Sequence, residues 1–130
     1  MILLDTHVLI WLIADVEKLS KPAAREIHRA RRAGEAISIS SISLLEIASL
    51  AAKDRITIAT PLQALLESLE ASFHVLPLTS RSCAKTADLP DKYPRDPADR
   101  IIGATALVEG LTLITADRNI LASRAVPTLW

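Results

Sequence analysis

The hydrophobic positions of this chain fall into two patterns, short apolar segments and longer stripes with helical spacing. Ile2-Leu3-Leu4 is a continuous apolar run, which is typical of a strand buried on both faces. Four further short segments are typical of strands: residues 36–40, 74–78, 111–115 and 126–129. A helical stripe, by contrast, is formed by Leu62, Leu65, Leu66 and Leu69.

The segments between the predicted strands have helical spacing and suitable ends. Ser20 is a good N-cap with Pro22 in the first turn, and Gly34 and Gly110 follow the expected ends of two helices. We predict helices over residues 6–14, 20–34, 42–53, 60 onward, 80–88, 97–109 and 117–122. Alternating strands and helices favour an α/β fold, a three-layer α/β/α sandwich with a central parallel sheet. The length favours a single domain over residues 1–130.

Four acidic residues lie close to the carboxyl ends of predicted strands, where ligands bind in sheets of this kind. Asp5 follows the first strand, and Asp117 lies just past the fourth. Glu46 lies in an otherwise apolar helical stretch, where burying an unpaired charge is costly. Asp99 lies near the start of the helix predicted at residues 97–109. We therefore expect these four side chains to converge at one edge of the sheet.

Such a group of carboxylates points to a metal site. Clustered carboxylates repel one another, and a divalent cation relieves this repulsion. Their oxygens are hard ligands that suit Mg²⁺, with Mn²⁺ as a substitute. Zinc is disfavoured, because His7, His28 and His74 share no ligand spacing. A metal held by carboxylates typically serves phosphoryl chemistry, in which it activates water and stabilises charge on a phosphodiester.

Each acid also has a purely structural interpretation. Asp5 and Asp117 are suitable N-caps for the helices that follow them, and Asp99 suits the positive end of a helix dipole. Glu46 could form an ion pair with a nearby Lys or Arg. Their joint placement at strand ends, rather than any single residue, favours a catalytic site.

Four stretches form a combined pattern that is more specific than any one of them. They are residues 5–11 (DTHVLIW), 40–47 (SSISLLEI), 95–102 (RDPADRII) and 112–117 (TLITAD). In order and spacing the pattern resembles the PIN domain, and in particular the VapC-like toxin ribonucleases of bacterial toxin–antitoxin pairs. The resemblance extends over essentially the whole chain, to the closing residues 126–130.

The resemblance implies a metal-dependent site that cleaves RNA. Its catalytic residues and metal ligands would be the four acids, Asp5, Glu46, Asp99 and Asp117. It also implies a homodimer and a small VapB-like antitoxin as partner. Members of the family differ in their RNA target, so the target, the cleavage site and the number of metals stay open.

Several other residues are secondary candidates. Thr6 could hydrogen-bond a water on the metal, and Arg100, like Arg118, could contact phosphate or balance the acids. Asp96 is the expected N-cap of the helix at residues 97–109, and whether it shares the metal site stays open. A basic group on the second helix is either a solvated face or a contact for RNA or antitoxin; it consists of Arg25, Arg29, Arg31 and Arg32.

Three further residues are expected to have no part in the chemistry. A metal-activated water needs no histidine, so a general-base role for His7 is disfavoured. Trp11 is expected in the core. Cys83, the one cysteine, is expected to be a small buried hydrophobe.

Composition narrows the class of protein. Fifteen basic residues balance fifteen acidic ones, which excludes a disordered polyelectrolyte and a strongly basic nucleic-acid binder but leaves room for a local basic patch. A single cysteine excludes an internal disulfide framework. No apolar run is long enough to span a bilayer, and the start of the chain lacks the basic region of a signal peptide. We expect a cytoplasmic protein.

Two alternatives to the nuclease remain. A phosphatase or phosphotransferase with an aspartate nucleophile also has Asp at the end of its first strand. Its family usually carries a second Asp two residues later, where this chain has His7. The other alternative is a non-catalytic binding module with the PIN fold. All four acids are present, so nothing in the sequence supports it.

Overall fold

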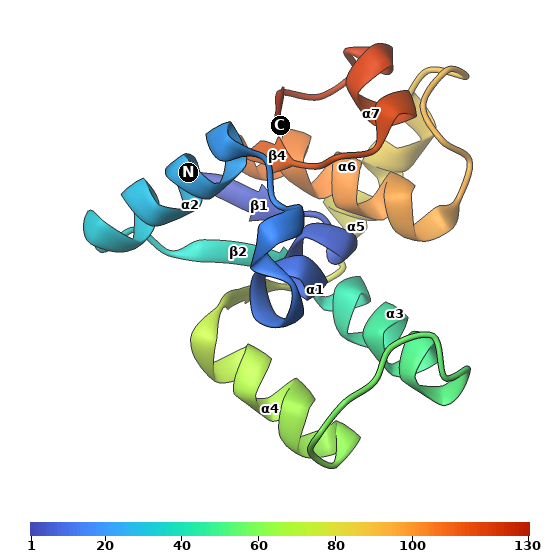
Figure 1. Ribbon diagram of the computed structural model, residues 1–130. Helices are drawn as coiled ribbons and strands as arrows, with labels where there is room; N and C mark the ends of the chain where they lie inside the picture. Colours follow the sequence, from blue (N-terminus) through green and yellow to red (C-terminus); the bar gives the residue numbers. More distant parts are fainter.

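The computed structural model describes residues 1–130, and a five-stranded parallel sheet lies between two layers of helices (Figure 1). The strands, in the order β3-β2-β1-β4-β5, pair in parallel throughout. They are short: β1 (Ile2–Leu4), β2 (Ile37–Ser40), β3 (His74–Leu76), β4 (Thr112–Ile114) and β5 (Thr128–Leu129). The predicted α/β/α sandwich is confirmed.

Seven α-helices connect and cover the strands. They are α1 (Thr6–Ala14), α2 (Lys21–Arg32), α3 (Ser41–Ala52), α4 (Leu62–Ser72), α5 (Ser80–Lys85), α6 (Pro97–Glu109) and α7 (Arg118–Ser123). The helix predicted at residues 80–88 is divided into α5 and a 3₁₀ turn at Thr86–Asp88. A second 3₁₀ turn, Val16–Lys18, was not predicted. The strand predicted at residues 74–78 ends at Leu76, because Pro77 has no N–H to continue the ladder.

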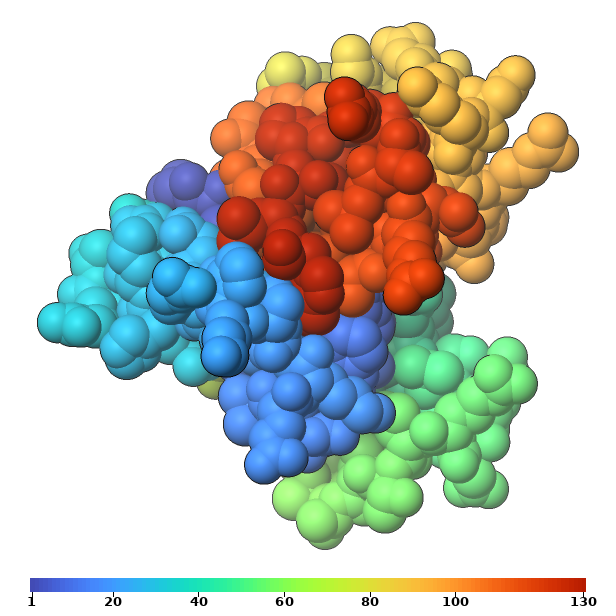
Figure 2. Space-filling model, turned by 45° about the horizontal axis from the view of Figure 1, so that its top comes forward, coloured from blue at the N-terminus to red at the C-terminus, as the bar shows by residue number.

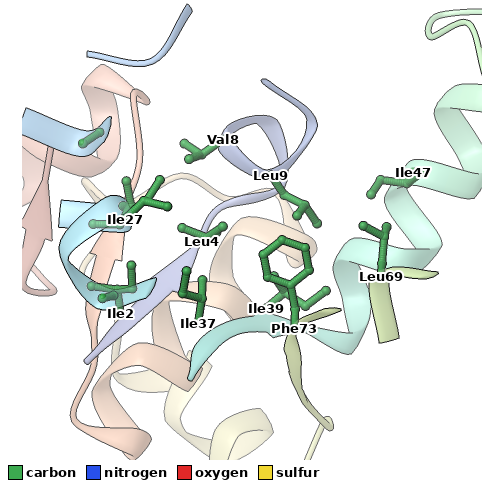
Figure 3. Close-up of a cluster of buried hydrophobic side chains, with 13 residues drawn as sticks. Ile2, Leu4, Val8, Leu9, Ile27, Ile37, Ile39, Ile47, Leu69 and Phe73 are labelled. Atoms are coloured by element: carbon green, nitrogen blue, oxygen red, sulfur yellow. The ribbon is translucent and has the colours of Figure 1, made fainter. Parts of the chain in front are cut away.

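Two hydrophobic clusters, one on each face of the sheet, form the core. Successive residues of a strand point to opposite faces, so Ile2 and Leu4 join one cluster and Leu3 joins the other. The first cluster lies under α1, α2, α3 and α4 and is drawn in Figure 3. The second lies under α6 and α7. This two-sided burial explains why β1, the central strand, is apolar at every position.

The order of the strands also determines where a site can form. From β1 the chain moves outward to β2 and β3, and then crosses to the other side to form β4 and β5. The direction therefore reverses between β1 and β4, and ligands of such sheets bind in the crevice at the carboxyl ends of the strands beside this reversal.

Two predictions about single side chains are wrong. Cys83 is exposed on α5, because the neighbouring Ser82 takes the inward position, where it is buried and completes a capping box with Thr79. Trp11 is only half-buried, since the inward positions of α1 are those of Val8 and Leu9. None of the helices combines the length and apolarity that crossing a membrane requires.

Candidate active site

Asp5 lies at the carboxyl end of β1, beside the reversal of strand order. Its N–H extends the sheet by donating to the Ile114 carbonyl (3.0 Å). The residue is only 3% exposed, and each carboxylate oxygen accepts a hydrogen bond. Oδ1 accepts from the Thr6 N–H (2.8 Å) and Oδ2 from the Thr115 hydroxyl (2.7 Å). Asp5 is thus the N-cap of α1 and is also bound to the end of β4.

Glu46, on α3, accepts a hydrogen bond from the Thr6 hydroxyl, which is itself bound by Ser43. Thr6 Oγ1 donates to Glu46 Oε1 (2.5 Å) and lies 2.8 Å from Ser43 Oγ. A hydroxyl has one hydrogen to donate, so Ser43 is the donor to Thr6. No lysine or arginine forms an ion pair with Glu46, and the ion-pair interpretation is wrong.

Asp96 and Asp99 begin α6, and their carboxylates have different partners. Asp96 is the N-cap, as predicted, and its Oδ1 accepts from the Ala98 N–H (2.8 Å) and more weakly from the Asp99 N–H (3.4 Å). The Asp99 carboxylate accepts no hydrogen bond within the chain, so it does not complete a capping box. Its carbonyl accepts from the hydroxyl of buried Tyr93 (2.8 Å), which holds the first turn of the helix.

Asp117 follows β4 and is joined to Asp5 through neighbouring groups. Its Oδ1 caps α7, as predicted, and its N–H donates to the Thr115 hydroxyl (3.1 Å). His7 Nε2 accepts from the Ala116 N–H (3.0 Å), so in neutral His7 the hydrogen is on Nδ1, 3.6 Å from Asp5 Oδ2. His7 therefore links the loop before Asp117 to Asp5.

The acids share one electrostatic environment. Burial raises the pKa of Asp99 from 3.8 to about 7, and the negative charges that add to this effect belong to Asp5, Asp96, Asp117 and Glu46. Burial also raises the pKa of Glu46; the hydrogen bond from Thr6 opposes this shift, and the charge of Asp5 adds to it. Desolvation and the neighbouring negative charges thus both favour the protonated form of these two carboxyl groups.

The donor set suits a hard cation. We refer to Asp5, Glu46, Asp99 and Asp117 as the acidic cluster. No three side chains of His, Cys, Asp or Glu lie close enough together to hold a metal ion in this conformation. The raised pKa values of Asp99 and Glu46 reflect the repulsion and desolvation that a cation would relieve. Four carboxylates and no nitrogen or sulfur donors fit Mg²⁺ or Mn²⁺ better than zinc.

The predicted basic group lies away from these acids. In Figure 1, α2 is on the far left, away from the starts of α3 and α6. Arg29 is bound by Glu26 and Glu35. Together with Arg25 and Arg32 it lines an open hollow of about 850 Å³ over α2. A role for these arginines in binding RNA or antitoxin stays a prediction.

The two arginines next to proposed ligands also differ. Arg100 Nη1 donates to the Thr86 carbonyl (3.1 Å), so it holds the 3₁₀ turn against α6. Arg118 is exposed at the start of α7 and forms no ion pair.

Three residues of the site were missed by sequence reasoning. Ser43 precedes Glu46 by three positions on α3, so helical spacing was a usable signal. Thr115 directly follows β4, at the level of Asp5, and its position at a strand end was a second signal. Tyr93 lies in a loop of irregular structure, and nothing in the local pattern indicates its contact with α6.

The chain is similar to known proteins over nearly its whole length. The PIN domain family matches residues 2–125 of the chain. Ribonuclease VapC22 of Mycobacterium tuberculosis is 36% identical over 123 residues, which is 95% of this chain and 92% of that protein.

Solved structures share the fold at lower identity. A chain of VapBC2 from Rickettsia felis, bound to a promoter DNA fragment, has a TM-score of 0.73 and 16% identity, and the match covers 99% of this chain and 98% of that one. A chain of FitAcB from Neisseria gonorrhoeae has a TM-score of 0.70 and 22% identity, with coverage of 100% and 97%.

Proposed function

Because this chain belongs to the PIN-domain family, we propose that it is a metal-dependent endoribonuclease, the toxin of a toxin–antitoxin pair. The observation that carries this proposal is the acidic cluster beside the strand reversal, where buried and half-buried carboxylates form no ion pair with a lysine or arginine. The 36% identity to a ribonuclease supports RNA as the substrate.

The acidic cluster would hold the metal through Asp5, Glu46, Asp99 and Asp117, with Mg²⁺ as the expected ion and Mn²⁺ as a substitute. When bound, the ion supplies a Lewis acid that activates water for attack on phosphorus and offsets the charge of the phosphodiester. Asp96 acts as the helix cap rather than as a ligand in this proposal. It is exposed, whereas Asp99 is half-buried beside the other acids and its carboxylate accepts no hydrogen bond within the chain.

The chain's own residues prepare this site by holding the ligands in position. Thr6 orients both Asp5, through its N–H, and Glu46, through its hydroxyl. Thr115 holds the second oxygen of Asp5. Preorganised ligands lose little freedom when the ion and substrate bind, and this lowers the free-energy cost of reaching the transition state.

The proposed partner is a VapB-like antitoxin. The structures that share this fold include VapBC pairs and a toxin–antitoxin complex from Klebsiella pneumoniae. An antitoxin would neutralise the acidic cluster with a basic side chain, since an Arg can bind carboxylates bidentately, or by covering it. A homodimer, a cytoplasmic location and a single domain over residues 1–130 complete the proposal.

The proposal is tested by mapping cleavage of total cellular RNA by purified, antitoxin-free protein. We expect discrete cuts that require Mg²⁺ or Mn²⁺, stop with a chelator, and are absent with Asp5→Asn protein that retains its circular dichroism spectrum. Folded wild-type protein that cuts no RNA with either ion would refute it, as would an Asp5→Asn variant of unchanged activity.

The same preparations test the phosphatase alternative. Asp5 is buried and both its oxygens accept hydrogen bonds, which disfavours attack on a phosphorus atom. A trapped aspartyl-phosphate on Asp5 would overturn the nuclease assignment. A folded, metal-binding protein without any activity would favour the non-catalytic binding module.

A further inference from the structure

A hollow of about 360 Å³ opens beside the acidic cluster, on the outer side of α1. Its volume lies within the range of small-ligand sites, roughly 300–1,000 Å³. The first turns of α1, the 3₁₀ turn after it and the segment that follows α3 all contribute to the hollow. The lining residues that matter are His7, Ile10, Trp11, Lys18, Arg55 and Ile56.

His7 forms the wall that this hollow shares with the acidic cluster. One edge of its ring faces Asp5, with Nδ1 3.6 Å from Oδ2, and the ring also lines the hollow. The hollow and the acidic cluster are thus neighbours, separated by a single side chain.

The inside of the hollow offers an aromatic surface. Trp11 is half-buried, and its ring meets His7 edge-on (centroids 5.0 Å apart) and lies against Trp130 at a tilt (5.7 Å). Figure 2 shows the C-terminal segment lying against the α1 side of the molecule. Trp11 is therefore braced on two sides, and Ile10 and Ile56 add apolar walls beside it. A rigid aromatic surface of this kind stacks a nucleobase without regard to its identity.

The rim of the hollow is cationic. Arg55 is exposed and forms no ion pair, so its guanidinium is free to bind a phosphate. Lys18 lies over the Trp11 ring (5.9 Å), although Asp15 offsets part of its charge at 3.6 Å. Stacking surfaces edged by basic groups are characteristic of sites for single-stranded nucleic acid.

We propose that the hollow binds one nucleotide of a single-stranded RNA next to the cleaved bond, with its base against Trp11 and its phosphate against Arg55. This inference rests on the proposed ribonuclease function and assigns a substrate contact within it. The cationic rim favours a phosphate over a basic antitoxin segment, which would be repelled there but attracted to the neighbouring acids.

The test uses an oligoribonucleotide that spans the mapped cleavage site. Steady-state cleavage gives kcat and KM, and its binding is measured in the cleavage-deficient Asp99→Asn background as a function of salt. The variants are Arg55→Ala, Trp11→Leu and Trp11→Phe. Arg81→Ala, which changes an exposed arginine on α5 outside the hollow, is the matched control.

We expect Arg55→Ala to raise KM with little change in kcat. The plot of the logarithm of the RNA-binding constant against the logarithm of salt concentration should become less steep by about 0.7, the contribution of one phosphate contact. Trp11→Leu should weaken binding about tenfold, the usual effect of losing one stacked base, and Trp11→Phe should restore most of it. Arg81→Ala should behave as wild type. Since Arg55 is exposed, its result does not depend on whether the Trp11 variants fold.

Three outcomes would overturn the inference. Arg55→Ala and folded Trp11→Leu proteins with wild-type KM would show that RNA does not use the hollow. Variants that cleave normally but escape inhibition by purified antitoxin would assign it to the antitoxin instead. Wild-type protein that neither cleaves nor binds RNA would refute the proposed function itself, a result that is visible before any variant is made.

Discussion

At the residue scale, Asp96 and Asp99 lie within one helical turn but have different roles. Asp96 caps the helix, and Asp99 is the proposed metal ligand. One carboxylate oxygen of Asp96 accepts hydrogen bonds from two N–H groups at the start of α6. The Asp99 carboxylate has no hydrogen-bond partner in the chain and is half-buried among other negative charges. Two neighbouring acids of the same type thus have opposite expected responses to substitution.

Asp96→Asn should keep the helix and most of the RNA cleavage, because Asn is as good an N-cap as Asp. Asp99→Asn should reduce cleavage by more than about 100-fold while the protein stays folded, since it removes a ligand charge. Cleavage and melting temperature are measured for both variants in parallel. An inactive Asp96→Asn with an active Asp99→Asn would reverse the assignment; two folded but inactive variants would indicate that the pair shares the metal.

The raised pKa of Asp99 predicts a pH dependence of stability in metal-free protein. The pKa is about 7 in the folded chain against an ordinary value of 3.8, so between these values the folded state binds the proton more tightly than the unfolded state. This contribution to the free energy of unfolding is greatest below about pH 4 and is lost as the pH rises to about 7. Urea denaturation in a chelator, for wild type and Asp99→Asn, measures it. Between about pH 4 and pH 7, the free energy of unfolding of the wild type should fall relative to that of the variant. If the two free energies change with pH in the same way, the pKa of Asp99 is not raised.

At the scale of elements, α6 is held in place by a close contact between Tyr93 and Gly103. A Cβ added at Gly103 would lie 2.6 Å from Tyr93 Cζ and closer still to its hydroxyl. The same hydroxyl donates to the Asp99 carbonyl, so this contact sets the position of the helical turn that carries Asp99. Gly103, in the middle of α6, therefore helps to determine where Asp99 lies in the acidic cluster.

Gly103→Ala should destabilise the protein by about 1–3 kcal/mol through overpacking against Tyr93. Helix propensity alone predicts the opposite sign, a gain of about 1 kcal/mol. Urea denaturation distinguishes the two, and a variant at least as stable as wild type would show that the contact is easily relieved. Tyr93→Phe keeps the ring and should cost about 1 kcal/mol for the lost hydrogen bond.

At the scale of the whole molecule, a chain of zero net charge separates its charges in space. The acidic cluster gathers at the carboxyl edge beside β1 and β4, whereas α2 carries the densest group of arginines. Without a bound cation, repulsion among the carboxylates at this edge lowers the stability of the folded state. A ligand that binds only the folded state and supplies positive charge there should stabilise the entire domain.

Mg²⁺ or Mn²⁺ should therefore raise the melting temperature. Binding to the folded state alone contributes about 2.7 kcal/mol when the ion is at 100 times its dissociation constant. A thermal scan with and without millimolar ion measures the shift, and Asp99→Asn should show a smaller one. Equal melting temperatures with and without either ion, in wild type and variant alike, would count against a metal site.

Structure that depends on near neighbours in the chain could be predicted from the sequence. Caps such as Ser20 and Asp96, and the alternation of apolar segments, depend on residues a few positions apart, so the elements were predictable along nearly the whole chain. The position of Asp5 and Asp117 at one edge of the sheet was predictable too, because parallel strands bring their carboxyl ends to the same edge.

Only the tertiary structure decided which groups hold those acids and how strongly burial acts on them. Thr115 binds Asp5 across 110 positions, and no local pattern relates the two residues. Glu46 accepts a hydrogen bond from the Thr6 hydroxyl and forms no ion pair, and Trp11 lies against Trp130 at the surface rather than in the core. Such contacts, and the pKa of a carboxylate, depend on distances and solvent exclusion between elements far apart in the chain, and these exist only once the sheet has assembled.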